Sequence, residues 1–311
     1  MSPAPSVPSP STPERIAAGL IGQLEAQVAS VLRGKPEPIR LAVVCLLAKG
    51  HVLIADVPGV GKTTLAQALA RSLGVDFQRI QFTSDLLPSD ILGVSIYRQE
   101  RQAFEFVRGP LFANVVLADE INRASPKTQS ALLEAMSERQ VSVDGQRLPL
   151  AEPFIVIATQ NPLEYVGTFP LPESQLDRFT MSLQLGYPPR VDERELLLSG
   201  GVEEAMANLK PAISRRELLQ LQDWVDEVRM AEKIVDYMLA LAGGSRSGAS
   251  EFLLGISTRA LQSLYRAAQA MALCEGRSDF IPDYVQAWAA PVLAHRVALM
   301  SGDDSPAAAL S

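Results

Sequence analysis

The sequence predicts an α/β fold with a mostly parallel sheet, followed by a smaller, all-helical domain. Five short segments have the character of strands, with helical stretches between them; they are residues 51–55, 77–82, 114–118, 154–159 and 181–185. Such alternation is typical of parallel sheets. After Tyr187-Pro188-Pro189 the chain becomes helix-rich. We therefore expect an α/β core at residues 14–188 and a helical domain at residues 189–311.

The core helices are predicted from apolar residues at helical spacing, over residues 14–31, 36–48, 63–73, 126–138 and 172–177. Two further segments interrupt the alternation of strands and helices. Residues 95–112 contain a strand-like stretch at 103–107. Residues 140–153 contain Asp144-Gly145, a strong signal for a two-residue hairpin turn. We expect both segments to be β-hairpins inserted beside helices.

The amino-acid composition limits the classes of protein to which the chain can belong. The chain has 311 residues, of which 47% are hydrophobic, enough for a substantial core. Its 28 basic and 35 acidic side chains give a net charge of -7. That charge disfavours nucleic acid and anionic membranes as partners, although it leaves room for a local basic patch. No apolar run approaches the ~20 residues that a membrane-spanning helix needs.

The N-terminal segment, residues 1–13, is rich in proline and serine. We expect a disordered tail there and not a signal peptide, because a basic start and an apolar stretch are both missing. The two cysteines, Cys45 and Cys274, lie far apart, and no CxxC pair occurs. We interpret them as buried core thiols and expect a cytoplasmic protein.

Residues 56–63 follow the pattern of a phosphate-binding loop, G-x-x-x-x-G-K-[ST], between a strand and a helix. Glycines let the backbone N–H groups turn toward phosphate oxygens, and the helix N-terminus adds partial positive charge. Lys62 is expected to contact the outer phosphates, and Thr63 to ligate Mg²⁺. The predicted nucleotide-binding residues are Asp56, Val57, Pro58, Gly59, Val60, Gly61, Lys62, Thr63 and Thr64. Asp56 departs from the pattern, which has glycine at that position.

Two carboxylates and an amide supply the other half of the expected site. The apolar segment 115–118 ends in Asp119 and Glu120. Asp119 is expected to hold Mg²⁺, largely through water, and Glu120 to polarise the attacking water. The next apolar strand is followed by Asn161 and Pro162. Asn161 is positioned either to contact the γ-phosphate or its water, or to form an Asx-turn before the proline.

Together these segments resemble the AAA+ ATPases and, more narrowly, the MoxR family. The resemblance covers nearly all of residues 20–300 and rests on residues 57–63, 118–124, 158–162, 171–179, 255–260 and 282–283. The string at 118–124, Ala-Asp-Glu-Ile-Asn-Arg-Ala, is far more specific than the phosphate loop alone. The resemblance implies ATP hydrolysis with ATP and Mg²⁺. It also implies rings, often hexamers, that remodel partner proteins with von Willebrand A domains.

The resemblance assigns further roles. Asn161 would be the sensor 1 residue. Arg178 would be the arginine finger, acting on the nucleotide of a neighbouring subunit, whereas the residues alone suggest only a surface ion pair in Asp177-Arg178. Arg259 would be the sensor 2 residue. The two hairpins would line the central pore. Arg123 has two readings, because it either reaches a subunit boundary or caps the following helix.

Three other functions fit parts of the pattern. A nucleic-acid motor of the related helicase branch has the same ATPase module, but the net charge and the lack of an added nucleic-acid-binding domain disfavour it. A GTPase is disfavoured because the Asn/Thr-Lys-x-Asp motif for reading guanine is missing. An inactive scaffold is disfavoured by the intact Lys62, Thr63, Asp119 and Glu120. The sequence does not identify the client.

Overall fold

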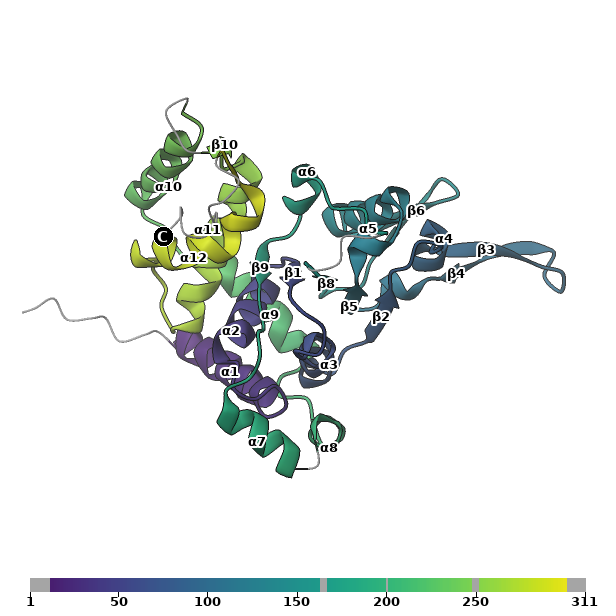
Figure 1. The fold of residues 1–311 in the computed structure, drawn as a ribbon, viewed down its shortest axis with the longest axis horizontal. Helices are drawn as coiled ribbons and strands as arrows, with labels where there is room; N and C mark the ends of the chain where they lie inside the picture. Colours follow the sequence, from purple (N-terminus) through teal and green to yellow (C-terminus); the bar gives the residue numbers. More distant parts are fainter. Residues whose placement is uncertain (1–11, 163–166, 200, 248–251, 301–311) are drawn as a thin grey trace, which may run out of the picture.

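A parallel sheet forms the centre of the molecule (Figure 1). The computed structural model describes residues 12–162, 167–199, 201–247 and 252–300. The sheet has the order β2 (Phe77–Gln81), β5 (Val115–Asp119), β8 (Ile155–Gln160), β1 (Val52–Ala55) and β9 (Met181–Leu183). Every adjacent pair is parallel. The predicted fold class and the places of its five strands are therefore confirmed.

Both faces of the sheet are buried, because successive strand residues point to opposite sides. On one face, Ile54 and Leu117 belong to a core shared with α1 (Thr12–Ala29), α2 (Pro36–Leu47) and α3 (Lys62–Leu73). On the other face, Leu53 and Val116 belong to a core shared with α4 (Pro88–Leu92) and α5 (Pro126–Glu138). Burial on both sides explains why β1 and the first four residues of β5 and β8 are apolar.

Two β-hairpins extend from this core, as predicted. The first pairs β3 (Gly93–Arg98) with β4 (Ala103–Arg108) and projects from the body in Figure 1. The second pairs β6 (Gln140–Val143) with β7 (Gln146–Pro149). Asp144 and Gly145 have φ of 50° and 77°, and positive φ at both central positions suits a tight hairpin turn. Ser95 Oγ donates to Asp144 Oδ2 at 2.5 Å and links the two hairpins.

The chain after residue 189 is mainly helical, as predicted. Its helices are α7 (Arg190–Leu198), α8 (Val202–Ala207), α9 (Arg215–Glu227), α10 (Glu232–Ser245), α11 (Thr258–Cys274) and α12 (Asp283–Leu293). A short antiparallel ribbon, β10 (Phe252–Leu254) with β11 (Ala298–Leu299), was not predicted. Strands of three and two residues are too short to leave a recognisable alternation in the sequence.

The C-terminal helices pack directly on the first two helices of the chain. Leu264 of α11 and Val285 of α12 lie in the same hydrophobic core as Leu24 of α1 and Val44 of α2. The division at residue 188 therefore falls between regions that share a core, and it stays a prediction. Cys45 and Cys274 are buried and unpaired. Within the described ranges, no helix is both long and apolar enough to cross a membrane.

Helix α1 begins at Thr12, so the last two residues of the predicted tail belong to the helix. Helix ends are hard to place from sequence to better than a residue or two. Residues 1–11 of the predicted tail lie outside the described residues.

His51 is a buried histidine whose surroundings require the neutral ring. Its Nδ1 accepts from the Val156 N–H at 2.9 Å, and its Nε2 donates to the Met136 carbonyl at 3.2 Å. A proton on Nδ1 would remove that acceptor. Burial lowers the pKa of His51 to about 4 and that of His295, which donates to the Phe179 carbonyl, to about 3.

The free energy of unfolding should therefore fall as the pH drops below about 6.5, the ordinary histidine pKa. The unfolded chain binds protons on His51 and His295 that the folded chain refuses down to pH values of about 4 and 3. Between pH 7.5 and 5.5 the loss should be about 2–3 kcal/mol, measurable by urea unfolding. A His51→Gln variant should lose about half of this dependence. An equal free energy of unfolding at the two pH values would contradict the conclusion that both histidine rings are neutral in the folded chain.

Candidate nucleotide site

The predicted phosphate loop lies between the end of β1 and the start of α3. Gly59 and Gly61 have φ of 84° and 100°, values that favour glycine. A side chain at Gly61 would also come within 2.9 Å of Leu32 Cδ1. The first turn of α3 presents its backbone N–H groups at this loop, where a phosphate is favoured. The local geometry is that of a phosphate cradle, and contact with a nucleotide stays a prediction.

The side chain of Asp56, at the first position of the loop, points to the segment after β9, and its contact with a nucleotide stays a prediction. Its carboxylate Oδ2 accepts from the N–H groups of Leu185 and Gly186, both at 2.7 Å. Its backbone carbonyl accepts from Lys62 Nζ at 2.6 Å. Asp56 therefore joins the phosphate loop to the segment after β9, and its carboxylate is already bonded within the protein.

Asp119 is the last residue of β5 and Glu120 follows it, and both are held by a buried threonine on β8. Thr159 Oγ1 donates to Asp119 Oδ1 at 2.6 Å and accepts from the Glu120 N–H at 2.9 Å. Glu120 has φ of 58°, an uncommon conformation for a residue with a side chain, often found at functional sites. Thr159 therefore fixes both carboxylate-bearing residues relative to one another.

Three more polar side chains contact these carboxylates. Arg79 Nη2 lies 2.6 Å from Asp119 Oδ2, and Gln81 Nε2 donates to Glu120 Oε2 at 2.7 Å. Neither contact was predicted from the sequence, although the polar residues within β2 were a visible signal. Arg123 Nε lies 3.2 Å from Glu120 Oε2, and Ser125 is the N-cap of α5. The helix-capping interpretation of Arg123 is therefore wrong.

The order of the strands brings the phosphate loop, the carboxylates and Asn161 to one edge of the sheet. Ala55 pairs with Gln160, and Ala118 pairs with Ala158, so the residues that follow these strands are neighbours. Asn161 is buried directly after β8. The alternative Asx-turn involves a segment that reaches residues 163–166, which lie outside the described residues.

The donor set suits Mg²⁺. Thr63 and Asp119 offer the hard oxygen ligands that this ion prefers, and Mg²⁺ usually keeps several waters and binds substrate phosphates. Among the described residues no group of three or more His, Cys, Asp or Glu side chains forms a cage for a metal. Thr63 and Asp119 would therefore fit this ion as two protein ligands, with waters and substrate phosphates as the others.

Arg178 and Arg259 lie at the opposite edge of the sheet. Arg178 lines a recess with Glu134 and Glu138, near the end of α5. Arg259 lines another recess with Lys49 and Thr180, which come just before β1 and β9. The phosphate loop follows the opposite end of β1, and the length of that strand is about 13 Å. Neither arginine is therefore placed against the phosphate loop of its own chain.

A buried network holds the segment that carries Arg178 against the helix that carries Arg259. Asp177 accepts from Ser257 Oγ at 3.0 Å and from Arg296 Nη1 at 3.2 Å. Ser257 is the N-cap of α11, and Arg296 exposes only 3% of its surface. Asp177 is thus paired with Arg296, and the interpretation of Asp177-Arg178 as a surface ion pair is wrong. Through this network the segment with Arg178 and the helix with Arg259 are held together.

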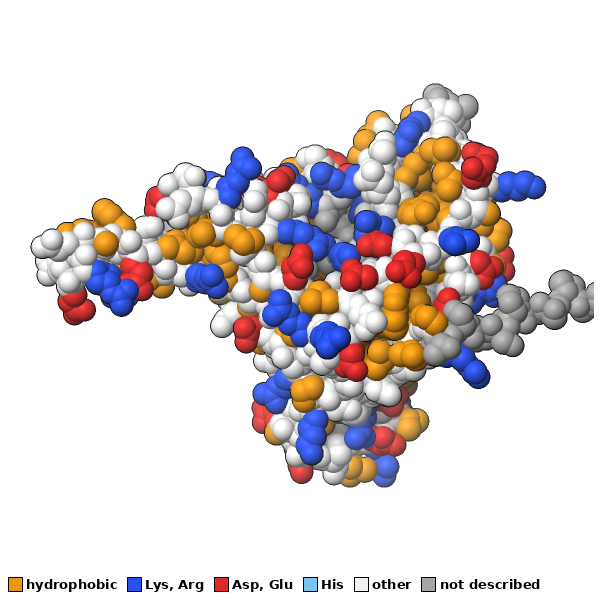
Figure 2. Space-filling model, turned by 180° about the vertical axis from the view of Figure 1, so that it is seen from behind, with side chains coloured by type: hydrophobic (Ala, Val, Ile, Leu, Met, Phe, Trp, Pro, Cys, Tyr) orange, Lys and Arg blue, Asp and Glu red, His pale blue; other side chains and the backbone are white. Residues whose placement is uncertain are grey.

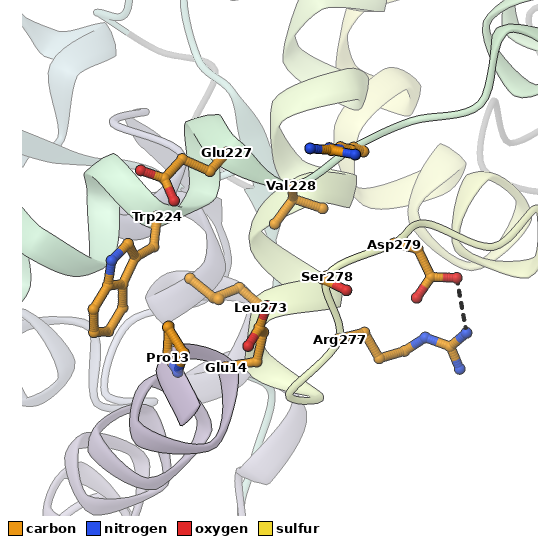
Figure 3. Close-up of a pocket in the computed structure, with 10 residues that line it drawn as sticks. Pro13, Glu14, Trp224, Glu227, Val228, Leu273, Arg277, Ser278 and Asp279 are labelled. Carbon is orange, nitrogen blue, oxygen red and sulfur yellow. Dashed lines mark hydrogen bonds and ion pairs between the residues drawn. The ribbon is translucent and has the colours of Figure 1, made fainter. Parts of the chain in front are cut away.

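A cavity of about 600 Å³ lies elsewhere, between the start of α1, α9 and the loop after α11 (Figure 3). Its charged lining residues are Glu14, Glu227, Arg229, Arg277 and Asp279, the last two forming an ion pair. No residue of the phosphate loop lines it. This cavity is therefore separate from the nucleotide site.

Comparison with known proteins supports the same interpretation. Residues 51–181 match the model of the ATPase family associated with various cellular activities, and residues 249–309 match an AAA lid domain. The Bacillus subtilis (strain 168) protein YeaC, itself described as uncharacterized, is 49% identical over 90% of this chain and 87% of its own. Chaperone MoxR1 of Mycobacterium tuberculosis is 42% identical over 88% of this chain and 74% of its own. A crystal structure of a Cytophaga hutchinsonii protein superposes with a TM-score of 0.88, at 35% identity, over 96% of this chain and 94% of its own.

The sheet order, the phosphate loop and the paired carboxylates define a P-loop ATPase of the AAA+ class, which hydrolyses ATP. Within that class, the chain belongs to the MoxR family.

Proposed function

We propose that this ATPase assembles into a ring and that each active site is shared between two neighbouring copies. The observation that carries the proposal is the separation of the site residues. The phosphate loop, Asp119 and Glu120 lie at one edge of the sheet, and Arg178 and Arg259 lie at the other. Head-to-tail contact between copies would bring the two edges together, and such contacts form a ring when the rotation between copies closes.

Within the shared site, each residue has a role that follows from its chemistry. Lys62 offsets charge on the outer phosphates, and Thr63 and Asp119 would hold Mg²⁺, which neutralises phosphate charge when bound. Glu120 accepts the proton of the attacking water. Arg178 of the next copy stabilises the charge that develops in the transition state. The Arg178 side chain is partly exposed and lines a recess, which supports contact with a partner outside the chain.

The first hairpin supports a role in contacting other polypeptides. Its exposed hydrophobic side chains, which we call the hairpin patch, are Val94, Ile96, Tyr97, Phe104 and Val107. Phe104 is 73% exposed, and Figure 2 shows hydrophobic side chains along this projection. Exposed apolar patches of this kind mark interaction sites. We propose that the hairpin patch contacts client proteins and that the ring acts on them as a chaperone in the cytoplasm. The family resemblance favours clients with von Willebrand A domains.

Sedimentation and phosphate release test the shared site together. The full chain, with ATP and Mg²⁺, should sediment as a closed oligomer, and its turnover per chain should fall steeply on dilution as the ring dissociates. The Lys62→Ala variant is the control for background hydrolysis. A monomer whose turnover per chain is independent of concentration would overturn the proposal.

A further inference from the structure

Two buried, oppositely charged side chains hold the segment that leads from the sheet into α7. Lys35 Nζ donates to the carbonyls of Leu185, at 2.6 Å, and Gly186. Asp56 Oδ2 accepts from the N–H groups of the same two residues. Lys35 and Asp56 expose only 5% and 8% of their surface. We call these two side chains the linker clamp.

The linker clamp binds all four polar backbone groups of Leu185 and Gly186. Charged partners make such hydrogen bonds about twice as strong as neutral ones. Gly186 has a φ of 60°, and Pro188 and Pro189 follow it, so this turn is the natural place for the chain to change direction into α7. Burial lowers the pKa of Lys35, and the Asp56 carboxylate opposes that shift and so favours the charged form of Lys35.

Asp56 also belongs to the phosphate loop. Its carbonyl accepts from Lys62 Nζ, the group expected to bind the outer phosphates, and its N–H donates to the Gln160 carbonyl beside Asn161. Bound phosphate would compete with this carbonyl for Lys62. A glycine, the usual residue at this position of the loop, has no side chain with which to reach the linker. The departure from the motif at Asp56 therefore adds a connection that the phosphate loop otherwise lacks.

We propose that Lys35 and Asp56 are positioning residues that couple occupancy of the phosphate loop to the linker at Leu185-Gly186, and through it to the helices from α7 onward. The proposal rests on the ATP binding set out above. Neither side chain needs to touch the nucleotide for this role. A purely structural clamp would hold the linker in the same way with or without ATP.

Hydrogen exchange of the linker amides measures directly how firmly the linker clamp holds them. In a peptide covering residues 184–189, the reporting amides are those of Leu185, Gly186 and Tyr187, because Pro188 and Pro189 have none. In the wild-type full chain, a nonhydrolysable ATP analogue should change the exchange rate of this peptide. In the Asp56→Gly variant, exchange should be about tenfold faster without nucleotide and should not respond to the analogue. Lys35→Met should behave like Asp56→Gly. Lys35→Arg, which keeps donors for the two carbonyls, should respond to the analogue as the wild type does.

Kinetics supply the second readout. Asp56→Gly should keep the ATP dissociation constant within about threefold while lowering kcat about tenfold or more. Glu195→Gln is the matched control, because it removes an exposed ion pair, Arg33–Glu195, between α7 and the segment after α1 that also carries Lys35. It should leave exchange and kcat unchanged. Thermal unfolding identifies any variant that fails to fold, and the glycine variant restores the usual residue of the loop.

The outcomes separate the two proposals. If the wild-type chain does not bind ATP, the proposed function itself fails. If it binds and hydrolyses ATP but its linker amides ignore the analogue, or if Asp56→Gly responds and turns over like the wild type, the coupling role is overturned and the ATPase stands.

Discussion

Replacing Arg178 with alanine should lower ATP turnover by about 10³–10⁵-fold, the range typical of arginine fingers. The binding of ATP should stay within about threefold of wild type, because Arg178 lies at the edge of the sheet away from its own phosphate loop. Phosphate release measures turnover, and a fluorescent ATP analogue measures binding. Loss of turnover with binding retained is the signature of a group that acts only in the transition state.

Arg147→Ala is the control for this result. Arg147 lines the same recess as Arg178 but comes from the second hairpin. It should reduce turnover far less than Arg178→Ala does. Normal turnover by Arg178→Ala in an assembled oligomer would show that Arg178 is not the finger, and an equal loss in both variants would point to a damaged surface.

The Glu120→Gln variant should bind ATP and turn over about 10²–10⁴-fold more slowly, the range expected for losing a general base. The substitution keeps the size of the side chain, and its amide oxygen can still accept from Gln81 Nε2. Binding should survive because the phosphate loop is untouched. Single-turnover hydrolysis measures the chemical step, and Glu37→Gln, an exposed change on α2, is the matched control.

The same variant should retain its client, because a slow enzyme stays in the ATP-bound state. A pull-down with Glu120→Gln in ATP should enrich partner proteins that Lys62→Ala, which is expected not to hold ATP, leaves behind. Hydrolysis at the wild-type rate by Glu120→Gln would mean that another group accepts the proton of the water.

The strands and the site could be predicted where neighbours in sequence carry the signal. The apolar run before Asp56 and the Asp144-Gly145 turn each act over a few residues, and periodicity or a motif reveals them. Contacts between distant segments could not be predicted in this way. Gln81 meets Glu120 only because β2 lies beside β5, and the sequence does not state the order of the strands.

The same limit applies to the buried charges. Arg296 contacts Asp177, and Lys35 contacts Leu185, across more than a hundred residues of chain. Nothing in the local pattern distinguishes these cations from solvated surface residues. Asp56 illustrates the same limit. The motif identifies it as a departure from glycine, but only the fold shows that its carboxylate accepts hydrogen bonds from Leu185 and Gly186.

If two copies complete one active site, mixing two inactive variants should restore activity. Arg178→Ala copies keep the phosphate loop, and Lys62→Ala copies keep Arg178. In equal, random mixture about a quarter of the head-to-tail contacts would join an intact phosphate loop to an intact finger. Co-assembled rings should therefore regain about a quarter of wild-type phosphate release per chain. A mixture no more active than the two separate variants would contradict a site shared between copies.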